Sequence, residues 1–336
     1  MASVPFTQPA RQTTSTGEPR RVGFELEFAG LEMNEVASLL ASSMDGEVEP
    51  KTHAECVVNV PDIGKFVVEL DWEFAKETAK ERARQHAEAS GIDAADDPFM
   101  EWLTRIASQI VPVEIVCPPM AIDTLHRLDA PIAALRKAGA LGTHESLLYA
   151  FGVHINAELP DLEAPTVQSY LQAYAVCQDW LISAHKVDPI RRVTPYIDLY
   201  PKDYLRQVLT YSGNEPMEQI IDDYLKFNPT RNRALDMTPL FKHIDETRLT
   251  SQLTDTRINS RPTFHYRMPN CNIEQSGWNL RPSWQVWCVI EHLANHPDQL
   301  ADLSAQCITH LDKIIPLERA PWHSTLNKIL ADLESA

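Results

Sequence analysis

VGFELEF, residues 22–28, alternates apolar and polar side chains along its whole length. The apolar positions of the stretch are Val22, Phe24, Leu26 and Phe28. A period of two residues is typical of a β-strand that turns one face toward a hydrophobic core. The stretch therefore predicts a half-buried strand that carries Glu25 and Glu27 together on its polar face.

Four further stretches are predicted strands with charged or polar side chains on one face. They are GKFVVELDWEF (64–74), VPVEIVCPP (111–119), YAFGVHINAEL (149–159) and RPTFHYRMP (261–269). Their polar faces carry Glu69, Asp71, Glu114, His154, Asn156, His265 and Arg267. Side chains two residues apart on a strand point the same way and lie about 7 Å apart. If the strands share one sheet, its polar face gathers carboxylates, two imidazoles and an arginine.

Helical patterns separate these strands, and some adjacent strands are joined by hairpins. This interleaving favours an α+β fold with a mainly antiparallel sheet packed by helices. Helices are predicted at 34–43, 122–138 and 166–185. We expect a disordered arm over 1–20 and a single domain over 21–336, with a helical insert at about 75–110, an irregular region at 190–262 and C-terminal helices at about 283–334.

Composition and charge exclude several classes of partner. The chain has 336 residues, a hydrophobic fraction of 44% and a net charge of -17. Such a negative surface repels nucleic-acid phosphates and anionic membranes, so neither is an expected partner. We see no apolar run of the roughly 20 residues that a membrane helix needs and no signal-peptide pattern, so a cytoplasmic protein is expected. Six scattered cysteines indicate reduced thiols rather than disulfides or a zinc site.

The recurrence of acids on successive strands points to a cation. A single Glu-x-Glu is typical of the solvent face of an amphipathic strand, and a single histidine between valine and isoleucine is typical of a structural side chain. Several carboxylates on one face, however, repel each other unless they are solvated or bind metal. Magnesium prefers oxygen ligands and retains substrate phosphates, so the pattern predicts a metal–nucleotide site.

Arginine is concentrated in one part of this acidic chain. Ten of the 19 arginines lie between residues 190 and 285, among them Arg231, Arg233 and Arg261. Guanidinium groups suit carboxylate and phosphate oxygens, although several of these arginines are expected to be solvated loop residues. No Gly-rich phosphate loop occurs among the 11 glycines, so nucleotide binding would depend on metals and arginines.

At this point the motifs, in their order along the chain, resemble a known family. VGFELEF resembles the first strand of the glutamine-synthetase-like carboxylate–amine ligases, and VEIVCPP, FGVHIN and RALDMTPL (233–240) resemble elements of their amidoligase branch. RPTFHYRMPNCNI resembles that branch's closing strand. The resemblance runs from about residue 20 to 295 and implies a glutamine-synthetase-like fold whose sheet has a polar, metal-binding face.

The resemblance also implies roles for individual residues. Glu25, His154 and His265 would hold the metal that carries the nucleotide phosphates. Glu27 and Glu114, with Glu69 or Asp71, would hold a second metal nearer the substrate. Arg267 would contact the transferred phosphate, and Arg231, Arg233 and Arg261 would contact ATP or a substrate carboxylate.

Two positions depart from the family pattern. His265 stands where the family usually has glutamate, and Asp236 stands where it has asparagine. Imidazole suits manganese or zinc better than magnesium. The implied cofactors are therefore ATP and Mg²⁺, with Mn²⁺ as the alternative ion.

The expected function is ATP-dependent formation of an amide or peptide bond through an acyl phosphate. Glu27 and Asp71 are candidates, by position alone, to take the proton of the amine. The expected partners are small-molecule or peptide carboxylates and amines, and the oligomeric state, homo-oligomer included, stays open. Three alternatives also stay open: a small-molecule kinase of the guanidino type, a non-catalytic binding protein on a decayed ligase scaffold, and a metal-dependent hydrolase.

Overall fold

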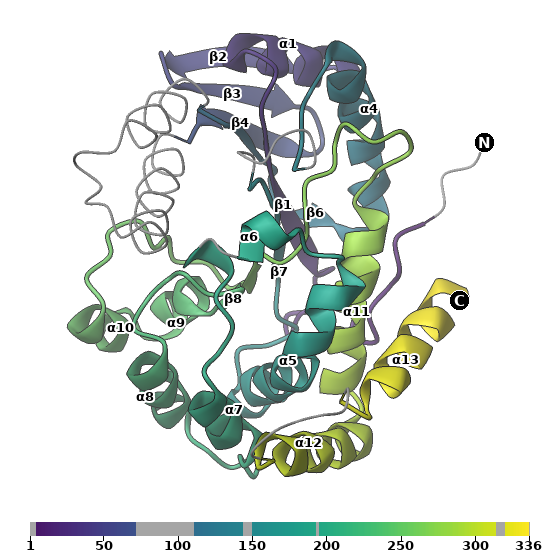
Figure 1. Ribbon diagram of the computed structural model, residues 1–336. Coiled ribbons are helices and arrows are strands. Elements are labelled where there is room, and N and C mark those ends of the chain that lie inside the picture. Colours follow the sequence, from purple (N-terminus) through teal and green to yellow (C-terminus); the bar gives the residue numbers. More distant parts are fainter. Residues whose placement is uncertain (1–4, 72–110, 144–149, 193–194, 314–319, 336) are drawn as a thin grey trace, which may run out of the picture.

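A computed structural model describes residues 5–71, 111–143, 150–192, 195–313 and 320–335. Within these residues the core is a nine-stranded antiparallel sheet of order β2-β3-β4-β5-β1-β7-β9-β8, with β6 paired to β1 (Figure 1). The strands are β1 (Arg21–Phe28), β2 (Glu47–Thr52), β3 (Glu55–Val60), β4 (Gly64–Leu70), β5 (Val113–Val116), β6 (Met120–Ala121), β7 (Val153–Ala157), β8 (Leu235–Asp236) and β9 (His265–Tyr266). The predicted α+β architecture with an antiparallel sheet is confirmed.

Strand β1 lies in the middle of the sheet, between β5 and β7. Every residue of β1 after Arg21 is buried, including both glutamates. The sequence predicted a half-buried strand, because alternation normally marks a solvated face. In the structure the polar face is covered as well, so Glu25 is 7% exposed and Glu27 is 5% exposed.

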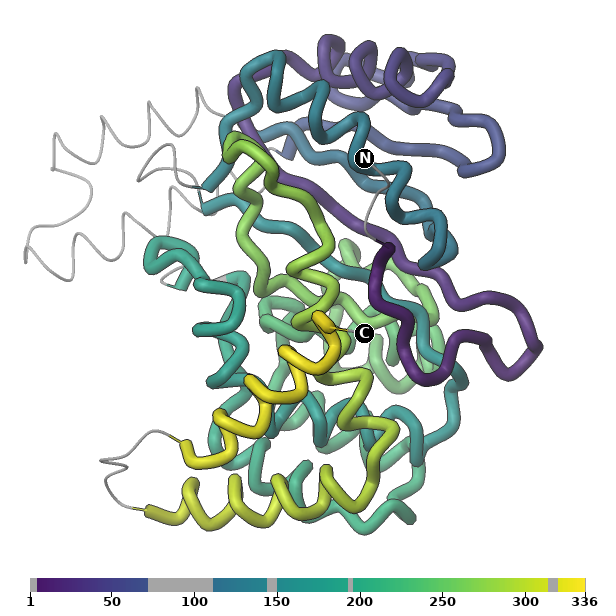
Figure 2. Tube along the Cα trace, turned by 90° about the vertical axis from the view of Figure 1, so that its right-hand side faces the viewer, coloured from purple at the N-terminus to yellow at the C-terminus, as the bar shows by residue number. Residues whose placement is uncertain are grey.

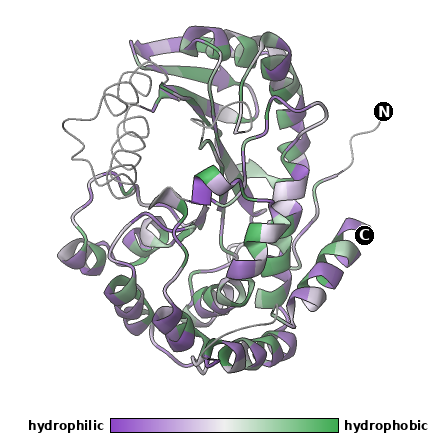
Figure 3. Ribbon diagram, in the orientation of Figure 1, coloured by the Kyte–Doolittle hydropathy of each residue, from purple (hydrophilic) through white to green (hydrophobic). Residues whose placement is uncertain are grey.

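Long helices pack on the sheet and on each other. Helix α1 (Met33–Met44) packs on β3 and on α4 (Asp129–Ala138), while α5 (Ala164–Ala184) packs on α11 (Arg281–Ala294). Helices α12 (Pro297–Leu311) and α13 (His323–Ser335) follow at the C-terminus and contact α5 and α11. Their surfaces alternate hydrophilic and hydrophobic segments, as expected for helices with one buried face (Figure 3).

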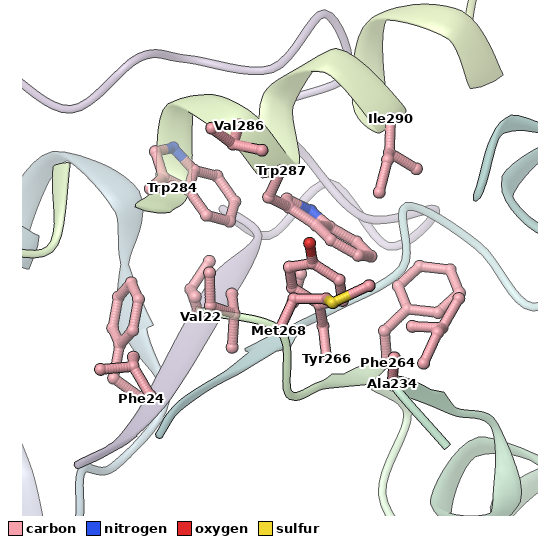
Figure 4. Packing of buried hydrophobic residues seen from close by; sticks show 14 of the residues in the cluster. Val22, Phe24, Ala234, Phe264, Tyr266, Met268, Trp284, Val286, Trp287 and Ile290 are labelled. Atoms are coloured by element: carbon pink, nitrogen blue, oxygen red, sulfur yellow. The ribbon is translucent and has the colours of Figure 1, made fainter. Parts of the chain in front are cut away.

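The two tryptophans of α11 form the centre of the apolar core near β1. Trp284 and Trp287 lie over Val22 of β1 and Tyr266 of β9 (Figure 4). The rings of Trp287 and Tyr266 have centroids 5.2 Å apart. This aromatic packing fixes the strand that carries Glu25 against the strand that carries His265, because one helix covers both.

The region predicted to be irregular, 190–262, contains several short helices. They are α6 (Pro189–Arg192), η2 (Pro195–Ile197), α7 (Lys202–Leu209), α8 (Met217–Phe227), α9 (Thr238–Ile244) and α10 (Glu246–Gln252). Helices α7 and α8 each follow a proline and bury one apolar face, through residues such as Tyr204 and Ile220. The frequent prolines mark helix starts here, which is why they were misinterpreted as loop signals.

Two other predictions need correction, and one strand was not predicted. The stretch 261–269 forms only the two-residue strand β9, and 122–138 is divided into the 3₁₀ helix η1 (Ile122–Leu128) and α4. The sequence analysis missed β2, an edge strand whose residues are all exposed and which contains Pro50. An exposed edge strand has no alternating pattern to detect, and proline is tolerated at an edge. The helical insert predicted at about 75–110 lies outside the described residues.

The predicted disordered arm packs on the body of the protein over residues 5–20. Phe6 is buried, and the carbonyl oxygen of Thr7 accepts a hydrogen bond of 2.8 Å from Trp284 Nε1. In Figure 2 this purple segment runs along the outside of the body before it enters β1. All six cysteines are free and buried, as expected for reduced thiols. Among the described helices, none combines the length and apolar character needed to cross a membrane.

A buried ion pair joins the start of β1 to α11. Arg20 donates to both carboxylate oxygens of Glu291, at 2.7 and 3.0 Å, and each side chain is 1% exposed. Tyr170 of α5 and Trp287 donate to the same carboxylate. The carboxylate of Glu291 therefore accepts hydrogen bonds from α5, from α11 and from the residue before β1. These bonds hold α5 and α11 against the strand that carries the glutamates.

We predict that Glu291→Gln lowers the free energy of unfolding by about 3–5 kcal/mol, because the amide leaves the Arg20 guanidinium buried without a counter-charge. Urea denaturation at pH 7 measures this change. The exposed Glu246, which pairs with Lys242 at 3.7 Å, provides the control, since Glu246→Gln should change stability by no more than about 0.5 kcal/mol. Equal losses in the two variants would contradict the structural role of the buried pair.

Candidate functional site

The pairing of the strands brings the predicted site residues together in one row. Glu27 of β1 lies opposite Glu114 of β5, and Glu114 lies opposite Glu69 of β4. On the other side of β1, Glu25 lies opposite His154 of β7. Residues directly opposite each other in an antiparallel pair have their side chains on the same face, so this row forms one continuous polar surface.

This surface forms one wall of a pocket of about 320 Å³. From the strands, the pocket is lined by Glu25, Glu27, Glu69, Glu114, Val116, His154, Asp236 and His265, with Asp71 just beyond β4 and Ala150 just before β7. From the loops and helices of the 190–267 region, it is lined by Arg191, Tyr196, Ile197, Arg231, Pro239, Arg257, Ile258, Asn259, Arg261 and Arg267. Acids and imidazoles thus line the wall formed by the sheet, and most of the arginines come from the segment after α5.

The first side-chain cluster in the pocket consists of Glu25, His154 and His265. Their ligand-type atoms all lie within 4.8 Å of one another, and all three residues are buried. His154 Nδ1 is 2.6 Å from Glu25 Oε2. The amide of Asn156 joins the other two members, since its Nδ2 donates to Glu25 Oε1 at 2.9 Å and its Oδ1 is 2.7 Å from His265 Nδ1.

The second cluster consists of Glu27, Glu114 and the same His154. Its ligand-type atoms also lie within 4.8 Å of one another. The ring of His154 faces both clusters, because Nδ1 contacts Glu25 while Nε2 lies 3.5 Å from Glu27 Oε1. Glu27 is held in place by the backbone N–H of Gly152, which donates to Oε2 at 2.7 Å.

The carboxylates of the second cluster are electrostatically strained. Burial raises the pKa of Glu114 well above its usual range, and the nearby Glu25, Glu27, Asp71 and Glu69 raise it further. Burial also raises the pKa of Glu27, where His154 opposes the shift. These acids lack enough positive charge to balance them, so a bound cation would stabilise their ionised forms.

The first cluster has the opposite balance of charge. Burial disfavours the ionised form of Glu25, but the hydrogen bond to His154 and the guanidinium of Arg261 hold its pKa well below the usual value, as would His265 in its protonated form. Burial lowers the pKa of His265 well below its usual range, and the cation of Arg267 lowers it further. Glu25 is therefore ionised and His265 neutral at pH 7, the forms in which these side chains bind metals.

The arginine side of the pocket has donors that the described residues do not satisfy. Arg267 donates through Nη2 to Asp236 Oδ2 at 3.1 Å, while its buried Nε has no hydrogen-bond partner. Arg261 donates to Glu25 Oε1 at 3.2 Å, and its Nε is likewise buried without a partner. Burial lowers the pKa of Arg231, as do the neighbouring Arg267 and Arg257. Mutually repelling guanidinium groups with spare donors suit an anion.

Arg191 is a pocket residue that the sequence analysis did not single out. Its guanidinium is buried and donates to the carbonyl oxygens of Arg267, Met268 and Pro269 at 2.7–2.8 Å. A Cβ at position 152 would lie 2.4 Å from Arg191 Nη2, so only glycine allows this approach. The lone signal in the sequence was membership of the arginine-rich region, and that signal did not separate Arg191 from its neighbours.

The positions of the predicted residues agree with the site except at one arginine. All the acids and histidines proposed as metal ligands or catalytic groups line the pocket, and so do Arg231, Arg261 and Arg267. The structure does not bring Arg233 to the pocket. Its guanidinium instead lies 3.7 Å from Asp198 and contacts the carbonyl oxygens of Leu199 and Phe227.

Comparison with known proteins identifies the family. No curated protein and no solved structure matches the chain. The family described as "Putative amidoligase enzyme" matches residues 18–289, which include every strand of the sheet and every residue that lines the pocket. The match covers most of the chain, and its limits agree with the range of the resemblance noted in the sequence. The chain therefore belongs to this amidoligase family, which is consistent with a ligase.

Proposed function

We propose that this protein is an ATP-dependent ligase that joins a carboxylate to an amine through an acyl phosphate. The observation that carries the proposal is the division of one pocket into a cation-binding wall and an anion-binding wall. Two metal-ligand clusters that share His154 stand on the sheet, and arginines with unsatisfied donors face them. A metal–triphosphate complex combines these two charges, so the pocket suits it.

The residues fit divalent metal ions on chemical grounds. Glu27 and Glu114, with Glu69 and Asp71 beside them in the pocket, would hold a hard ion through carboxylate oxygens. Glu25, His154 and His265 would hold a second ion. The raised pKa of Glu114 supports this assignment, because crowded buried carboxylates lose their mutual repulsion when a cation is bound.

The arginines fit the phosphates and the reacting carboxylate. Arg267 has one guanidinium edge bound to Asp236, which fixes its direction, and a buried Nε with no partner. In the proposal this side chain contacts the transferred phosphoryl group. Arg231 and Arg261 bind nucleotide or substrate oxygens, and Arg257, also in the pocket lining, joins them. Arg233 has no part in the proposal, because it lies outside the pocket.

ATP, as co-substrate, would supply a phosphoryl group to a substrate carboxylate, and this transfer would give an acyl phosphate and ADP. An amine would then attack the acyl carbon, and phosphate would leave. For that attack the amine must lose a proton. Glu27 is positioned by the Gly152 N–H and lines the pocket, which makes it a candidate proton acceptor. Asp71 lines the same pocket and is the second candidate. The substrates would be small-molecule or peptide carboxylates and amines.

Release of ADP tests the proposed function. Purified protein is incubated with ATP, Mg²⁺ or Mn²⁺ and pooled carboxylic acids, amino acids and amines. We predict ADP release that requires both a carboxylate and an amine and that falls by about 100-fold or more in Glu25→Gln, because the variant loses a charged metal ligand. The matched control is Glu47→Gln, an exposed glutamate on β2 of the same sheet, which should retain full activity.

Other outcomes of this assay favour other functions. ADP release that needs a phosphoryl acceptor but no amine would indicate a small-molecule kinase. A rise in melting temperature with nucleotide, without turnover in any pool, would indicate a binding protein on a decayed scaffold. Turnover without ATP would indicate a hydrolase. Absence of both turnover and nucleotide binding would contradict the division of the pocket into two charged walls.

The strain of the acidic cluster predicts the effect of pH on stability. The pKa of Glu114 is higher in the folded than in the unfolded protein, so the folded state binds the extra proton and stability falls as pH rises between the two values. In the presence of a chelator, Glu114→Gln should therefore melt about 2 °C or more above the wild type at pH 8, and this advantage should shrink as pH falls.

The same substitution should weaken metal binding, because a neutral amide replaces a carboxylate ligand. Mg²⁺ should thus raise the melting temperature of the wild type more than that of Glu114→Gln. Scanning calorimetry over pH 5–8, with and without Mg²⁺, measures both effects. A variant that is less stable than the wild type at pH 8 in chelator would show that Glu114 contributes structure rather than strain.

A further inference from the structure

The two clusters in the pocket differ in the atoms that they offer to a metal. The second cluster offers two carboxylates, and two further acids, Glu69 and Asp71, line the pocket with it, so it can hold an ion without the shared imidazole of His154. The first cluster offers one carboxylate, from Glu25, and two imidazoles. The difference arises at position 265, where β9 places a histidine 4% exposed and with its Nδ1 4.0 Å from Glu25 Oε1.

Charge makes the first cluster a poor site for magnesium. Mg²⁺ is held mainly by its attraction to carboxylate oxygens, and it dehydrates reluctantly. Glu25 is the sole carboxylate of this cluster, and its Oε1 already pairs with the Arg261 guanidinium at 3.2 Å. A hard ion such as Mg²⁺ would therefore gain little binding free energy at this cluster. Imidazole nitrogens, in contrast, form stronger bonds to manganese, iron, cobalt or zinc, for which a set of two histidines and one carboxylate is a common ligand group.

Asn156 holds His265 in a form that can bind a metal. The amide nitrogen of Asn156 donates to Glu25, so the amide oxygen is the atom that faces His265 Nδ1. Arg261 Nη2 also lies 3.2 Å from Nδ1, but the amide oxygen is nearer, at 2.7 Å, and accepts the Nδ1–H hydrogen, which leaves the lone pair on Nε2. Metal-binding histidines are commonly oriented in this way by a hydrogen bond to the other ring nitrogen. The contact therefore orients the ring and fixes its tautomer.

We propose that His265 makes the first cluster selective for a transition-metal divalent ion such as Mn²⁺ over Mg²⁺, while the carboxylate-rich second cluster takes Mg²⁺. The inference rests on the proposed metal-binding role of the pocket, and it makes the protein a site for two different ions. His265 is thus the residue that determines metal specificity, and Asn156 is the residue that positions it.

Direct binding of Mn²⁺ tests the proposal without any assay of catalysis. Full-length protein is titrated with Mn²⁺ by calorimetry in millimolar Mg²⁺, which occupies the second cluster. We expect Mn²⁺ to bind the wild type in this excess of Mg²⁺. His265→Glu should lower the ratio of Mn²⁺ to Mg²⁺ affinity by about tenfold or more, because a carboxylate restores the oxygen ligand that Mg²⁺ prefers. Glu47→Gln, at an exposed glutamate of β2, is the matched control and should leave Mn²⁺ binding in Mg²⁺ unchanged.

Pulsed electron paramagnetic resonance of bound Mn²⁺ provides a second measurement, since it detects the nitrogen nuclei of coordinated imidazoles. His265→Gln, which adds no charge and is close in size, should reduce the nitrogen signal and weaken Mn²⁺ binding by about 10-fold or more. This variant keeps the proposal testable if His265→Glu does not fold. An unchanged nitrogen signal in His265→Gln, or equal affinity of the wild-type first site for both ions, would overturn the proposal.

The binding and activity measurements together show whether this inference or the proposed function fails. Selective Mn²⁺ binding that depends on His265, in a protein that releases no ADP with any pool, would leave the metal assignment standing and remove the ligase proposal. ADP release with the wild type in Mg²⁺ alone, without any Mn²⁺-selective site, would keep the ligase and overturn the assignment of His265.

Discussion

Burial of like charges on adjacent strands is the constraint on which the rest of this structure depends. Glu25, Glu27 and Glu114 lie within one sheet, each less than 9% exposed, where water cannot screen their repulsion. A fold that keeps them there must gain stability elsewhere. The Arg20–Glu291 pair and the tryptophans of α11 do this, since both hold β1 in the centre of the sheet from the face opposite the acids. Structural and functional polar groups are thereby separated on the two sides of one strand.

Negative and positive side chains lie on opposite walls of the pocket. The sheet supplies acids and imidazoles, while the helices and loops after α5 supply arginines. Two salt bridges connect the walls, Arg261 to Glu25 and Arg267 to Asp236. Each of these arginines keeps a buried Nε without a partner, so the connection leaves hydrogen-bonding capacity unused. Buried donors of this kind are costly in a purely structural role, and their position beside strained carboxylates is understandable if a ligand that carries both metal and phosphate binds between them.

The sequence predicted the residues of this site better than the elements that surround it. Period-two alternation identified β1, β4, β5 and β7, and therefore the acids and His154, because side-chain direction on a strand follows directly from position. Strand order and register were not accessible, since they depend on pairings distant in sequence; nothing in the motifs placed Glu114 between Glu27 and Glu69. Most of the short helices of 190–262 were missed because prolines stand at their starts, as at α7, α8 and α9. Arg191 and Arg233 were indistinguishable from other arginines, since only tertiary contacts turn the former toward the pocket and the latter toward Asp198.

His154 makes the two clusters interdependent. One ring nitrogen contacts Glu25 and the other faces Glu27, so a single imidazole cannot adjust to one cluster without moving relative to the other. Its strand β7 is itself held by β1 on one side and by β9, with His265, on the other. A shift in the position of an ion at one cluster would therefore affect the other cluster through the ring of His154 and the paired strand β7. In-line transfer of a phosphoryl group between two substrates, as proposed here, would require a fixed spacing between two ions, and the central, buried strand pair β1–β7 would set that spacing.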